Sequence, residues 1–230
     1  MNRRNGVILA LDVTDASRAA SIAAATKDCI DAVKIGYPLV LAAGPEMITA
    51  LSKTALIICD FKVADIPSTN ELIVREAVRR GASAVIVHGL TGRDSVAACV
   101  NAAKPAEIFV VTEMSHPGAE EFMAANAERM ARIAKELGAA GIVAPATRPE
   151  RLRVLHDIVH PLQVLAPGVG AQGGDVAAVL ANGATADGTG LVISSSRAVL
   201  YAGSGSDYAE AARAAALKLR DEINLCRKIK

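Results

Sequence analysis

The segment from Asp60 to Pro67, with the sequence DFKVADIP, carries two carboxylates and one ammonium group within a few residues. Side chains of a β-strand repeat every second residue, so Asp60 and Lys62 should point to the same side if the run LIIC before them is a strand. Asp65 then falls in the turn before Pro67, and proline is favoured at the first position of a helix. We expect two carboxylates to flank the Lys62 ammonium, and perturbed pairs of this kind are typical of acid–base sites.

An exposed ion pair at a strand end is the ordinary interpretation of an Asp-x-Lys triplet, and such pairs contribute little to stability. Asp60, however, follows four apolar residues, which predicts a partly desolvated carboxylate. Desolvated charges with specific partners gather at active sites. The position of Asp60 therefore favours a functional pair over a surface pair.

A second segment, Pro167 to Gly174 with the sequence PGVGAQGG, has the composition of an anion-binding loop. Its glycines allow unusual backbone angles, its free backbone N–H groups can bind phosphate, and we expect Gln172 to open the following helix. Arg197 follows the last apolar run, and its planar guanidinium can donate two hydrogen bonds to a phosphate. Without Arg197, a simple flexible loop would be an equally good interpretation of the glycines.

These segments belong to a chain in which short apolar runs alternate with longer amphipathic runs from end to end. Apolar runs without strict polar alternation are typical of parallel strands covered by helices. Segments such as Thr69 to Arg80 and Glu120 to Leu137 are expected to be covering helices. The eight predicted strands are Val7 to Asp12, Ala32 to Gly36, Leu56 to Phe61, Ala84 to His88, Glu107 to Thr112, Gly141 to Ala144, Gln163 to Pro167 and Leu191 to Ser195.

Eight such units in 230 residues favour an α/β fold, a closed (β/α)8 TIM barrel that forms a single domain over residues 1–230. An open doubly wound sheet would have the same alternation, and polar residues help to choose between the two. They lie at or just past the carboxyl ends of the predicted strands, which in a barrel form one mouth where active sites are built. These residues are Asp12, Lys34, Asp60, Lys62, His88, Thr112 and Ser196.

Composition limits the classes of function. Hydrophobic residues make up 52% of the chain and the formal net charge is +1, so we expect an ordered protein without a general attraction for nucleic acid. No apolar run is long enough to span a membrane, and the N-terminal MNRRNG does not lead into a secretory signal, which predicts a cytoplasmic protein. The four cysteines are scattered, with no CxxC pair and no histidine at metal-ligand spacing, so we expect buried reduced thiols and no metal site.

The DFKVADIP segment resembles the D-x-K-x-x-D signature of the orotidine 5'-monophosphate decarboxylase superfamily. Three further segments, KIGYPL from Lys34, TEMSHPGA from Thr112 and PGVGAQGG from Pro167, resemble the archaeal branch of this decarboxylase family. The resemblance implies an enzyme without metal or cofactor that converts orotidine 5'-monophosphate to uridine 5'-monophosphate and CO2, the last step of UMP biosynthesis. It also implies a homodimer in which Asp65 and Thr69 reach the site of the neighbouring subunit.

The resemblance also assigns roles to single residues: Lys62 would protonate C6, Ser115 would contact the pyrimidine, and Asp12 with Lys34 would contact the ribose. Taken alone, Asp12 could instead cap the first helix, and Lys34 could be a strand-end lysine whose ammonium reaches solvent. The expected catalytic residues are Lys62, Asp60, Asp65 and Lys34. The expected substrate-binding residues are Asp12, Lys34, Thr69, Ser115, Pro167, Gly168, Val169, Gly170, Gln172, Ser196 and Arg197.

Two other functions stay open at this point. Metal-dependent sister enzymes, 3-keto-L-gulonate-6-phosphate decarboxylase and hexulose-6-phosphate synthase, share the D-x-K-x-x-D segment, but they resemble one another in carrying a glutamate where this chain has Lys34. A barrel that binds phosphate or nucleotide without catalysis is the other alternative. The chain also departs from the family's Gly-Arg after strand eight, with three serines before Arg197 and one extra residue before Tyr201.

Some residues have no firm assignment. Thr185 to Gly190 is rich in Gly and Thr and predicts a long turn. His88 and His116 lie in different segments, without a carboxylate at metal-ligand spacing, so we expect structural or loop-closing roles for them. The role of Glu113 is open.

Overall fold

The computed structural model describes residues 5–170, 173–185 and 188–228. Eight parallel strands follow one another around a closed barrel, and the last strand pairs with the first. The strands are β1 (Val7–Ala10), β2 (Ala32–Gly36), β3 (Ile57–Val63), β4 (Ala84–His88), β5 (Glu107–Val111), β6 (Gly141–Val143), β7 (Gln163–Pro167) and β8 (Leu191–Ser195).

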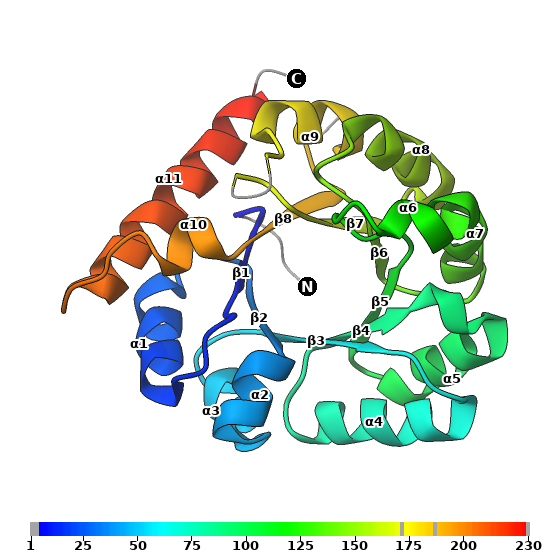
Figure 1. The fold of residues 1–230 in the computed structure, drawn as a ribbon, viewed down its shortest axis with the longest axis horizontal. Helices are drawn as coiled ribbons and strands as arrows, with labels where there is room; N and C mark the ends of the chain where they lie inside the picture. Colours follow the sequence, from blue (N-terminus) through cyan, green and yellow to red (C-terminus); the bar gives the residue numbers. More distant parts are fainter. Residues whose placement is uncertain (1–4, 171–172, 186–187, 229–230) are drawn as a thin grey trace.

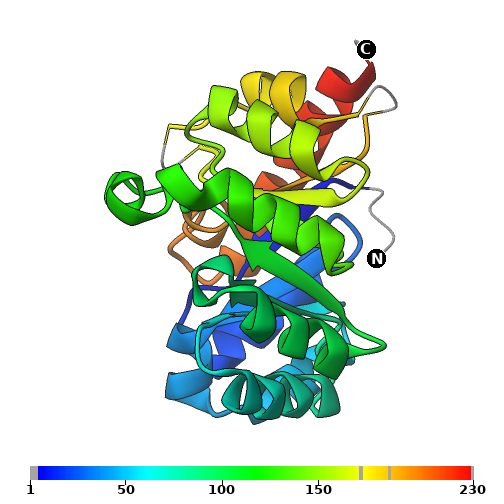
Figure 2. The same cartoon turned by 90° about the vertical axis from the view of Figure 1, so that its right-hand side faces the viewer.

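Helices form a ring around the strands, as the view down the barrel shows (Figure 1). They are α1 (Ala16–Thr26), α2 (Tyr37–Ala43), α3 (Glu46–Ser52), α4 (Pro67–Arg79), α5 (Arg93–Ala103), α6 (Ala119–Phe122), α7 (Ala127–Glu136), α8 (Pro149–Val159), α9 (Val176–Gly183), α10 (Arg197–Leu200) and α11 (Tyr208–Lys228), with 3-10 turns η1 (Gly89–Thr91) and η2 (Ala124–Asn126). The side view shows that α6, in green at the left, projects from one end of the barrel (Figure 2). Within the described part of the chain, no helix combines the length and apolarity needed to cross a membrane.

The closed barrel confirms the predicted (β/α)8 fold and excludes the open doubly wound sheet. The predicted helix at Thr69 to Arg80 is α4, with Pro67 in its first turn as expected. The single helix predicted at Glu120 to Leu137 is wrong, because that stretch is divided into α6, η2 and α7. The 3-10 turn η2 interrupts the α-helical backbone between Phe122 and Ala127.

Two separate hydrophobic clusters account for the layers of the barrel. The outer cluster lies between strands and helices and includes Leu9, Ile35 and Ile57. The inner cluster fills the barrel and includes Ile8 and Ile58, which are sequence neighbours of outer residues. Strand side chains alternate between the two faces, so every strand is apolar on both, as parallel sheets require.

The inner cluster closes one end of the barrel. The ring of Phe109 is completely buried there and lies against Gly141 on the neighbouring strand. A Cβ atom at Gly141 would lie 2.7 Å from Phe109 Cε1 and 2.4 Å from the Gln163 carbonyl oxygen. Glycine is therefore needed at this position. The polar groups that could carry out chemistry lie at the opposite end of the barrel.

The turn predicted between β7 and β8 is present. The Thr185 amide donates to the Thr189 carbonyl and the Gly188 amide to the Thr185 carbonyl, each at 2.9 Å. Residues 186–187 lie outside the described residues. This turn precedes β8 and lies away from the carboxyl end of that strand.

Candidate active site

Three charged side chains from β2 and β3 meet at the carboxyl end of the barrel. Lys34 Nζ lies 2.5 Å from Asp60 Oδ2, and Lys62 Nζ lies 2.7 Å from Asp60 Oδ1. The side chains of Lys34 and Asp60 are 8% and 11% exposed, whereas that of Lys62 is 37% exposed. One buried carboxylate therefore holds two ammonium groups, of which one reaches the solvent.

The alternation of strand side chains explains why Lys34 and Asp60 meet. Lys34 is two residues beyond Ala32, and Asp60 is two residues beyond Ile58, and both apolar residues belong to the inner cluster. A period of two directs each charged side chain into the barrel above that apolar layer. Because β2 and β3 are hydrogen-bonded neighbours, the opposite charges come into contact.

Lys62 has an unusual backbone conformation, with φ of 45°. The pairing of β3 with β4 also loses its register between Cys59 and Val63, which lie on either side of Lys62. A positive φ is strained for a residue with a side chain, and such strain concentrates at functional sites. The side chains of Lys62 and Asp60 still meet on one side of the strand, as the alternation predicts.

The charges of this cluster change the ionisation of neighbouring groups. Burial acts to raise the pKa of Asp60, but the positive charges of Lys34 and Lys62 outweigh it, and the pKa lies below the ordinary 3.8. Burial, aided by the Lys62 charge, lowers the pKa of His88 below 6.5. Burial, aided by the Asp60 charge, raises the pKa of Cys59 to about 12. At neutral pH the aspartate is therefore charged, while the imidazole and thiol are neutral.

The expectation that Asp60 and Asp65 both flank Lys62 is wrong within one chain. Asp65 is exposed, and among the described residues its carboxylate makes no ion pair and instead accepts from the Ile66 amide at 2.7 Å. The Asp65 backbone is held by the buried Asn70 side chain, which accepts from its N–H and donates to its C=O, both at 2.9 Å. These local bonds direct the loop away from Lys62.

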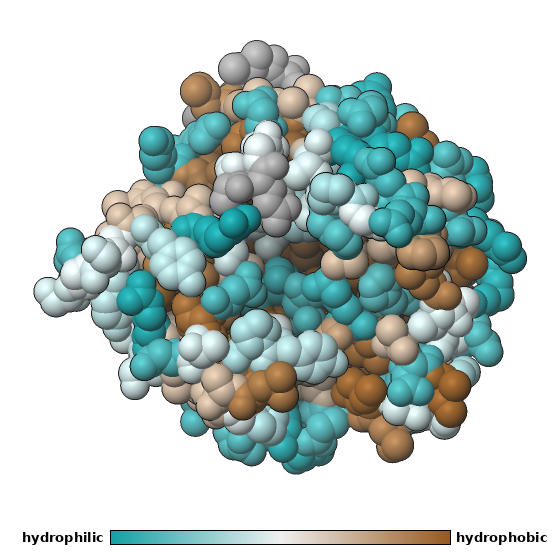
Figure 3. All heavy atoms as spheres, in the orientation of Figure 1, coloured by the Kyte–Doolittle hydropathy of each residue, from teal (hydrophilic) through white to brown (hydrophobic). Residues whose placement is uncertain are grey.

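A cavity of about 120 Å³ opens above the charged cluster. Lys34, Asp60 and Lys62 line one side, and Met114 and Ser115 line another. Its floor is apolar and consists of Ile86, Val111, Val143 and Leu165. The space-filling view shows hydrophilic residues gathered around the hollowed centre of this face (Figure 3). An apolar floor beside a few polar groups suits a flat ring with a charged substituent.

A second cavity, of about 100 Å³, adjoins the first and shares Lys34 and Pro167 with it. It is also lined by Asp12, Gly168, Val169, Ser196 and Arg197, all predicted as substrate-binding residues. Ser196 Oγ donates to Asp12 Oδ2 at 2.7 Å, which ties the carboxyl ends of β8 and β1 together. Because Asp15 caps α1, Asp12 is not the cap of that helix.

The glycine-rich loop after β7 only partly matches its prediction. The amides of Gly170 and Gly174 are not free, since they donate to the carbonyls of Gly174 and Gly168 at 2.9 and 3.1 Å. The amide of Val169 has no acceptor among the described residues. The next helix, α9, begins at Val176 with Asp175 as its cap. Gln172, predicted to open that helix, lies outside the described residues.

Arg197 is the first residue of α10 and is exposed. Within the described chain its guanidinium forms no ion pair. Ser194 and Ser195 are the last residues of β8, and Ser196 is the N-cap residue of α10. The departure from the family's Gly-Arg therefore leaves Arg197 beside the second cavity. A guanidinium without an ion pair next to the free Val169 amide is suited to a phosphate dianion.

A cluster that the sequence did not predict lies beneath the Ser115 loop. Glu113 is completely buried and forms ion pairs with Arg148 and Arg151, which flank the start of α8. A glutamate next to Ser115 and two arginines three residues apart were the available signal, but nothing in the sequence connects them. His116, in the same loop, is exposed, and the Nδ1 atom of His88 is buried without a partner in the described chain.

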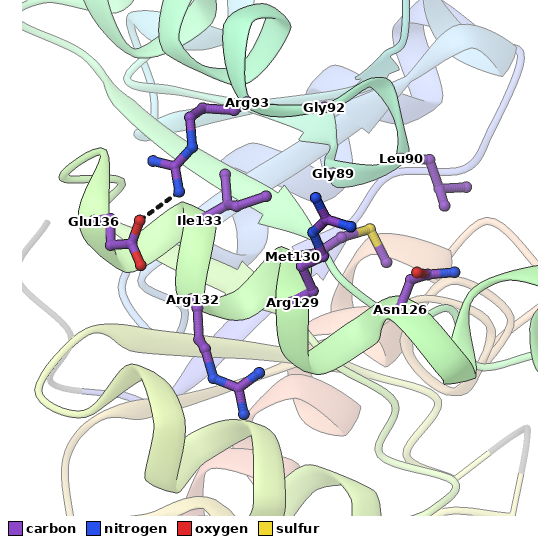
Figure 4. Close-up of a pocket in the computed structure, with 10 residues that line it drawn as sticks. All are labelled: Gly89, Leu90, Gly92, Arg93, Asn126, Arg129, Met130, Arg132, Ile133 and Glu136. Atoms are coloured by element: carbon purple, nitrogen blue, oxygen red, sulfur yellow. Dashed lines mark hydrogen bonds and ion pairs between the residues drawn. The ribbon is translucent and has the colours of Figure 1, made fainter.

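A larger cavity elsewhere in the molecule does not contain this chemistry. It measures about 520 Å³ and lies between η1 and α7. Figure 4 shows its lining, in which Arg93 pairs with Glu136 and Arg129 and Met130 come from α7. None of the predicted site residues lines it. In the described part of the chain, no three His, Cys, Asp or Glu side chains are grouped so that they could hold a metal ion.

The sequence and the fold match known proteins. A family model described as Orotidine 5'-phosphate decarboxylase / HUMPS family matches residues 5–215. An orotidine 5'-phosphate decarboxylase of Methanosarcina mazei is 50% identical over 187 residues, which cover 80% of this chain and 85% of that protein. The family-model match includes every segment described above as part of the candidate site.

Solved structures give the same result. The orotidine 5'-monophosphate decarboxylase of Methanocaldococcus jannaschii, complexed with the inhibitor BMP, matches with a TM-score of 0.86 and 41% identity, over 95% of this chain and 98% of that one. The orotidine 5'-phosphate decarboxylase of Pyrococcus horikoshii OT3 matches with a TM-score of 0.82 and 40% identity, over 95% and 99%.

Proposed function

This chain belongs to the orotidine 5'-phosphate decarboxylase / HUMPS family, and we propose how its side chains carry out the reaction. It catalyses the decarboxylation of orotidine 5'-monophosphate to uridine 5'-monophosphate and CO2, the last step of UMP biosynthesis. The observation that carries the mechanism is the contact of Asp60 with both Lys34 and Lys62 beside an apolar cavity.

Lys62 is the proposed proton donor. Loss of CO2 from C6 leaves a carbanion that no adjacent carbonyl or imine can delocalise, so the charge must be stabilised electrostatically. The Lys62 ammonium lines the cavity and is the more exposed of the two. It can neutralise the developing charge and then deliver its proton to C6. Lys34, which is nearly buried, keeps Asp60 paired when Lys62 moves toward substrate.

Asp60 is proposed to lie against the carboxylate that leaves. Two carboxylates about 4 Å apart repel by about 4 kcal/mol at an effective dielectric constant of about 20. Enzymes lower barriers by about 8 to 23 kcal/mol, so repulsion alone is insufficient. We assign the larger part of the barrier reduction to the preorganised charges of Lys34, Asp60 and Lys62, completed by Asp65.

The two adjoining cavities indicate where the other groups of the substrate bind. We assign the pyrimidine to the cavity with Ser115 and the phosphate to the cavity with Arg197, with Asp12 and Lys34 between them at the ribose. The phosphate would be bound by Pro167, Gly168, Val169, Gly170, Gln172, Ser196 and Arg197. Binding energy from this remote dianion can position the reacting carboxylate.

Asp65 is proposed to act across a homodimer interface, together with Thr69. The loop and helix that carry them expose large apolar side chains, with Ile66 63% and Leu72 69% exposed. Hydrophobic residues are also visible over α4 and α5 at the lower right of Figure 3. Exposed apolar surface of this kind marks contact with another protein, and a second copy would bring Asp65 to the Lys62 that it does not reach within one chain.

The proposal needs no metal. A divalent cation bound here would need a carboxylate ligand at the position of Lys34. The Lys34 ammonium would instead repel that cation. Cys29, Cys59 and Cys99 are buried free thiols, which supports a reducing compartment such as the cytoplasm.

The test is the loss of orotidine 5'-monophosphate absorbance with purified protein in excess EDTA, with Lys62→Ala measured in parallel. Turnover in the presence of EDTA should persist in the wild type and disappear in the variant, while affinity for uridine 5'-monophosphate stays within about tenfold. Turnover by Lys62→Ala would contradict the assignment of the proton donor. Activity that requires added magnesium and a sugar phosphate would favour the sister enzymes.

The shared site has its own test. Lys62→Ala and Asp65→Ala protein are each expected to be nearly inactive, but a heterodimer of the two would contain one site with both residues intact. Random reassociation should therefore restore about a quarter of wild-type activity. A mixture that stays inactive, although exchange of subunits is demonstrated with tagged chains, would place Asp65 and Lys62 of one chain in one site.

A further inference from the structure

The loop from β5 to α6 carries Ser115 and is anchored by charges that the proposed mechanism does not use. Glu113 has a side chain of 0% exposure, and two arginines share its carboxylate. Arg148 Nη2 lies 2.9 Å from Oε1, and Arg151 Nε lies 3.2 Å from Oε2. Both carboxylate oxygens are therefore occupied, and the group is compensated where it is buried.

Arg148 also binds the backbone next to Ser115. Its Nη2 atom donates to the Met114 carbonyl at 2.7 Å. In a trans peptide the C=O and N–H groups point in opposite directions, so a fixed Met114 carbonyl fixes the direction of the Ser115 N–H. Thr147 Oγ1 donates to the Ser115 carbonyl at 3.1 Å. The peptide groups on both sides of the Ser115 Cα atom are thus fixed from the segment after β6.

The donors of Ser115 are left free by this arrangement. Ser115 lines the cavity above Lys62, and among the described residues neither its N–H nor its hydroxyl makes a hydrogen bond. Glu113 and Arg148 do not line that cavity. They can therefore affect a ligand there through the orientation of Ser115 and not through contact.

We propose that Glu113 and Arg148 are positioning residues that direct the N–H and hydroxyl of Ser115 at the pyrimidine of the substrate, so that they set affinity for the base. The proposal rests on the assignment of this cavity to the pyrimidine. A guanidinium suits the task because its planar donors bind a carboxylate and a carbonyl at fixed angles, which an ammonium does not do.

Arg151 supplies a matched control. It contacts the same carboxylate, but its other partners are the Ala124 carbonyl at 3.3 Å and Glu128 at 3.8 Å. It makes no contact with the backbone of Met114 or Ser115 in the described structure. Arg148→Met and Arg151→Met therefore each leave Glu113 one arginine, and they differ in whether the Ser115 loop loses an anchor.

The experiment compares the affinity of both variants for uridine 5'-monophosphate and for ribose 5-phosphate, which lacks the base. Arg148→Met should lower the affinity for uridine 5'-monophosphate about tenfold, because one well-placed hydrogen bond to the base is lost. It should lower the affinity for ribose 5-phosphate by less than about twofold. Arg151→Met should change both affinities by less than about twofold. The proposal would be overturned if the two variants had equal effects, or if Arg148→Met lowered the affinity for both ligands equally.

Coupling to Ser115 gives a second readout. In a Ser115→Ala background the hydroxyl is absent but the backbone N–H remains, so the effect of Arg148→Met on the affinity for uridine 5'-monophosphate should fall to the part carried by the N–H, about threefold. An undiminished tenfold effect would mean that Arg148 does not position the Ser115 hydroxyl. If Arg148→Met does not fold, Arg148→Lys gives the same comparison, since a point charge does not reproduce both bonds.

The result is independent of the proposed mechanism. A wild type that turns over orotidine 5'-monophosphate, with no difference between Arg148→Met and Arg151→Met, would overturn the positioning role and leave the decarboxylase mechanism intact. A base-dependent loss of affinity in Arg148→Met together with full turnover by Lys62→Ala would support the positioning role and overturn the proposed mechanism.

Discussion

Two carboxylates of this protein are each held between two cations, and the cations differ. Asp60 lies between Lys34 and Lys62, with one ammonium 37% exposed beside a cavity. Glu113 lies between Arg148 and Arg151, whose side chains are 17% and 26% exposed. The first cluster is built on adjacent strands, and the second joins the loop after β5 to the start of α8.

The difference separates a reacting cluster from an anchoring cluster. A lysine ammonium can give up a proton and can rotate toward a ligand, whereas an arginine guanidinium stays charged and donates in a fixed plane. Lysine is therefore suited to the position where a proton is transferred. Arginine is suited to the position where a loop must keep its shape. The choice of cation, more than the geometry of the carboxylate, indicates which task each cluster has.

The largest effect is expected from exchanging the cation in the reacting cluster. Lys62→Arg keeps the positive charge beside Asp60 but removes the group that can transfer a proton. Turnover should fall about 10⁴-fold, since a positioned general acid contributes about 10²- to 10⁴-fold and the larger group also misplaces the charge. The measurement is single-turnover decarboxylation, with affinity for uridine 5'-monophosphate as a control for the site's integrity.

The matched exchange in the anchoring cluster is Arg148→Lys, which should lower turnover at saturating substrate by less than about tenfold. If Lys62→Arg retains activity, the distinction between the two clusters by cation type is wrong. If both exchanges abolish turnover, the cluster at Glu113 takes part in the chemistry.

A smaller effect, on stability, is expected from removing each carboxylate. Glu113→Gln should cost about 3 to 5 kcal/mol of unfolding free energy, because it removes the buried charge that pairs with both guanidinium groups and leaves them only the longer ion-pair contacts to Glu120 and Glu128. Asp60→Asn should cost about 1 to 3 kcal/mol, since Lys62 can turn into solvent and the asparagine side-chain oxygen can still accept from Lys34. Urea unfolding at neutral pH measures both changes. A larger cost for Asp60→Asn than for Glu113→Gln would contradict this ranking.

The sequence was sufficient for the parts of the site that depend on local periodicity. The spacing of Asp60 and Lys62 predicted their contact, and the apolar runs predicted eight strands whose ends meet at one mouth. It also placed Pro67 in the first turn of α4. These features need only the alternation of a strand and the restricted φ of proline, which hold before any tertiary contact forms.

The parts that failed depend on contacts between distant residues. Asp65 does not reach Lys62 in one chain, because the buried side chains of Asn70 and Ser95 hold the backbone of its loop. The ion pair of Glu113 with Arg148 joins residues 35 positions apart, and nothing in either local sequence announces the other. The helix expected from Glu120 to Leu137 is broken by the 3-10 turn at Ala124–Asn126, on both sides of which Met123 and Met130 pack in the cluster inside the barrel. Each of these depends on which loops become neighbours around the barrel.

The smallest effect is expected from pH, and it isolates the charge at Asp60. Burial opposes ionisation of this carboxyl, but Lys34 and Lys62 lower its pKa below the ordinary 3.8. A depressed pKa in the folded state stabilises the protein above the unfolded value, and that stabilisation is lost as pH falls through the lower folded value. The difference in unfolding free energy between wild type and Asp60→Asn should thus be constant from about pH 7 to about pH 5, and should shrink below about pH 4. Urea unfolding of both proteins across this range measures it. A difference that grows on acidification would mean that the two lysines do not stabilise the charged form of Asp60, and the contrast with the arginine cluster would lose its electrostatic basis.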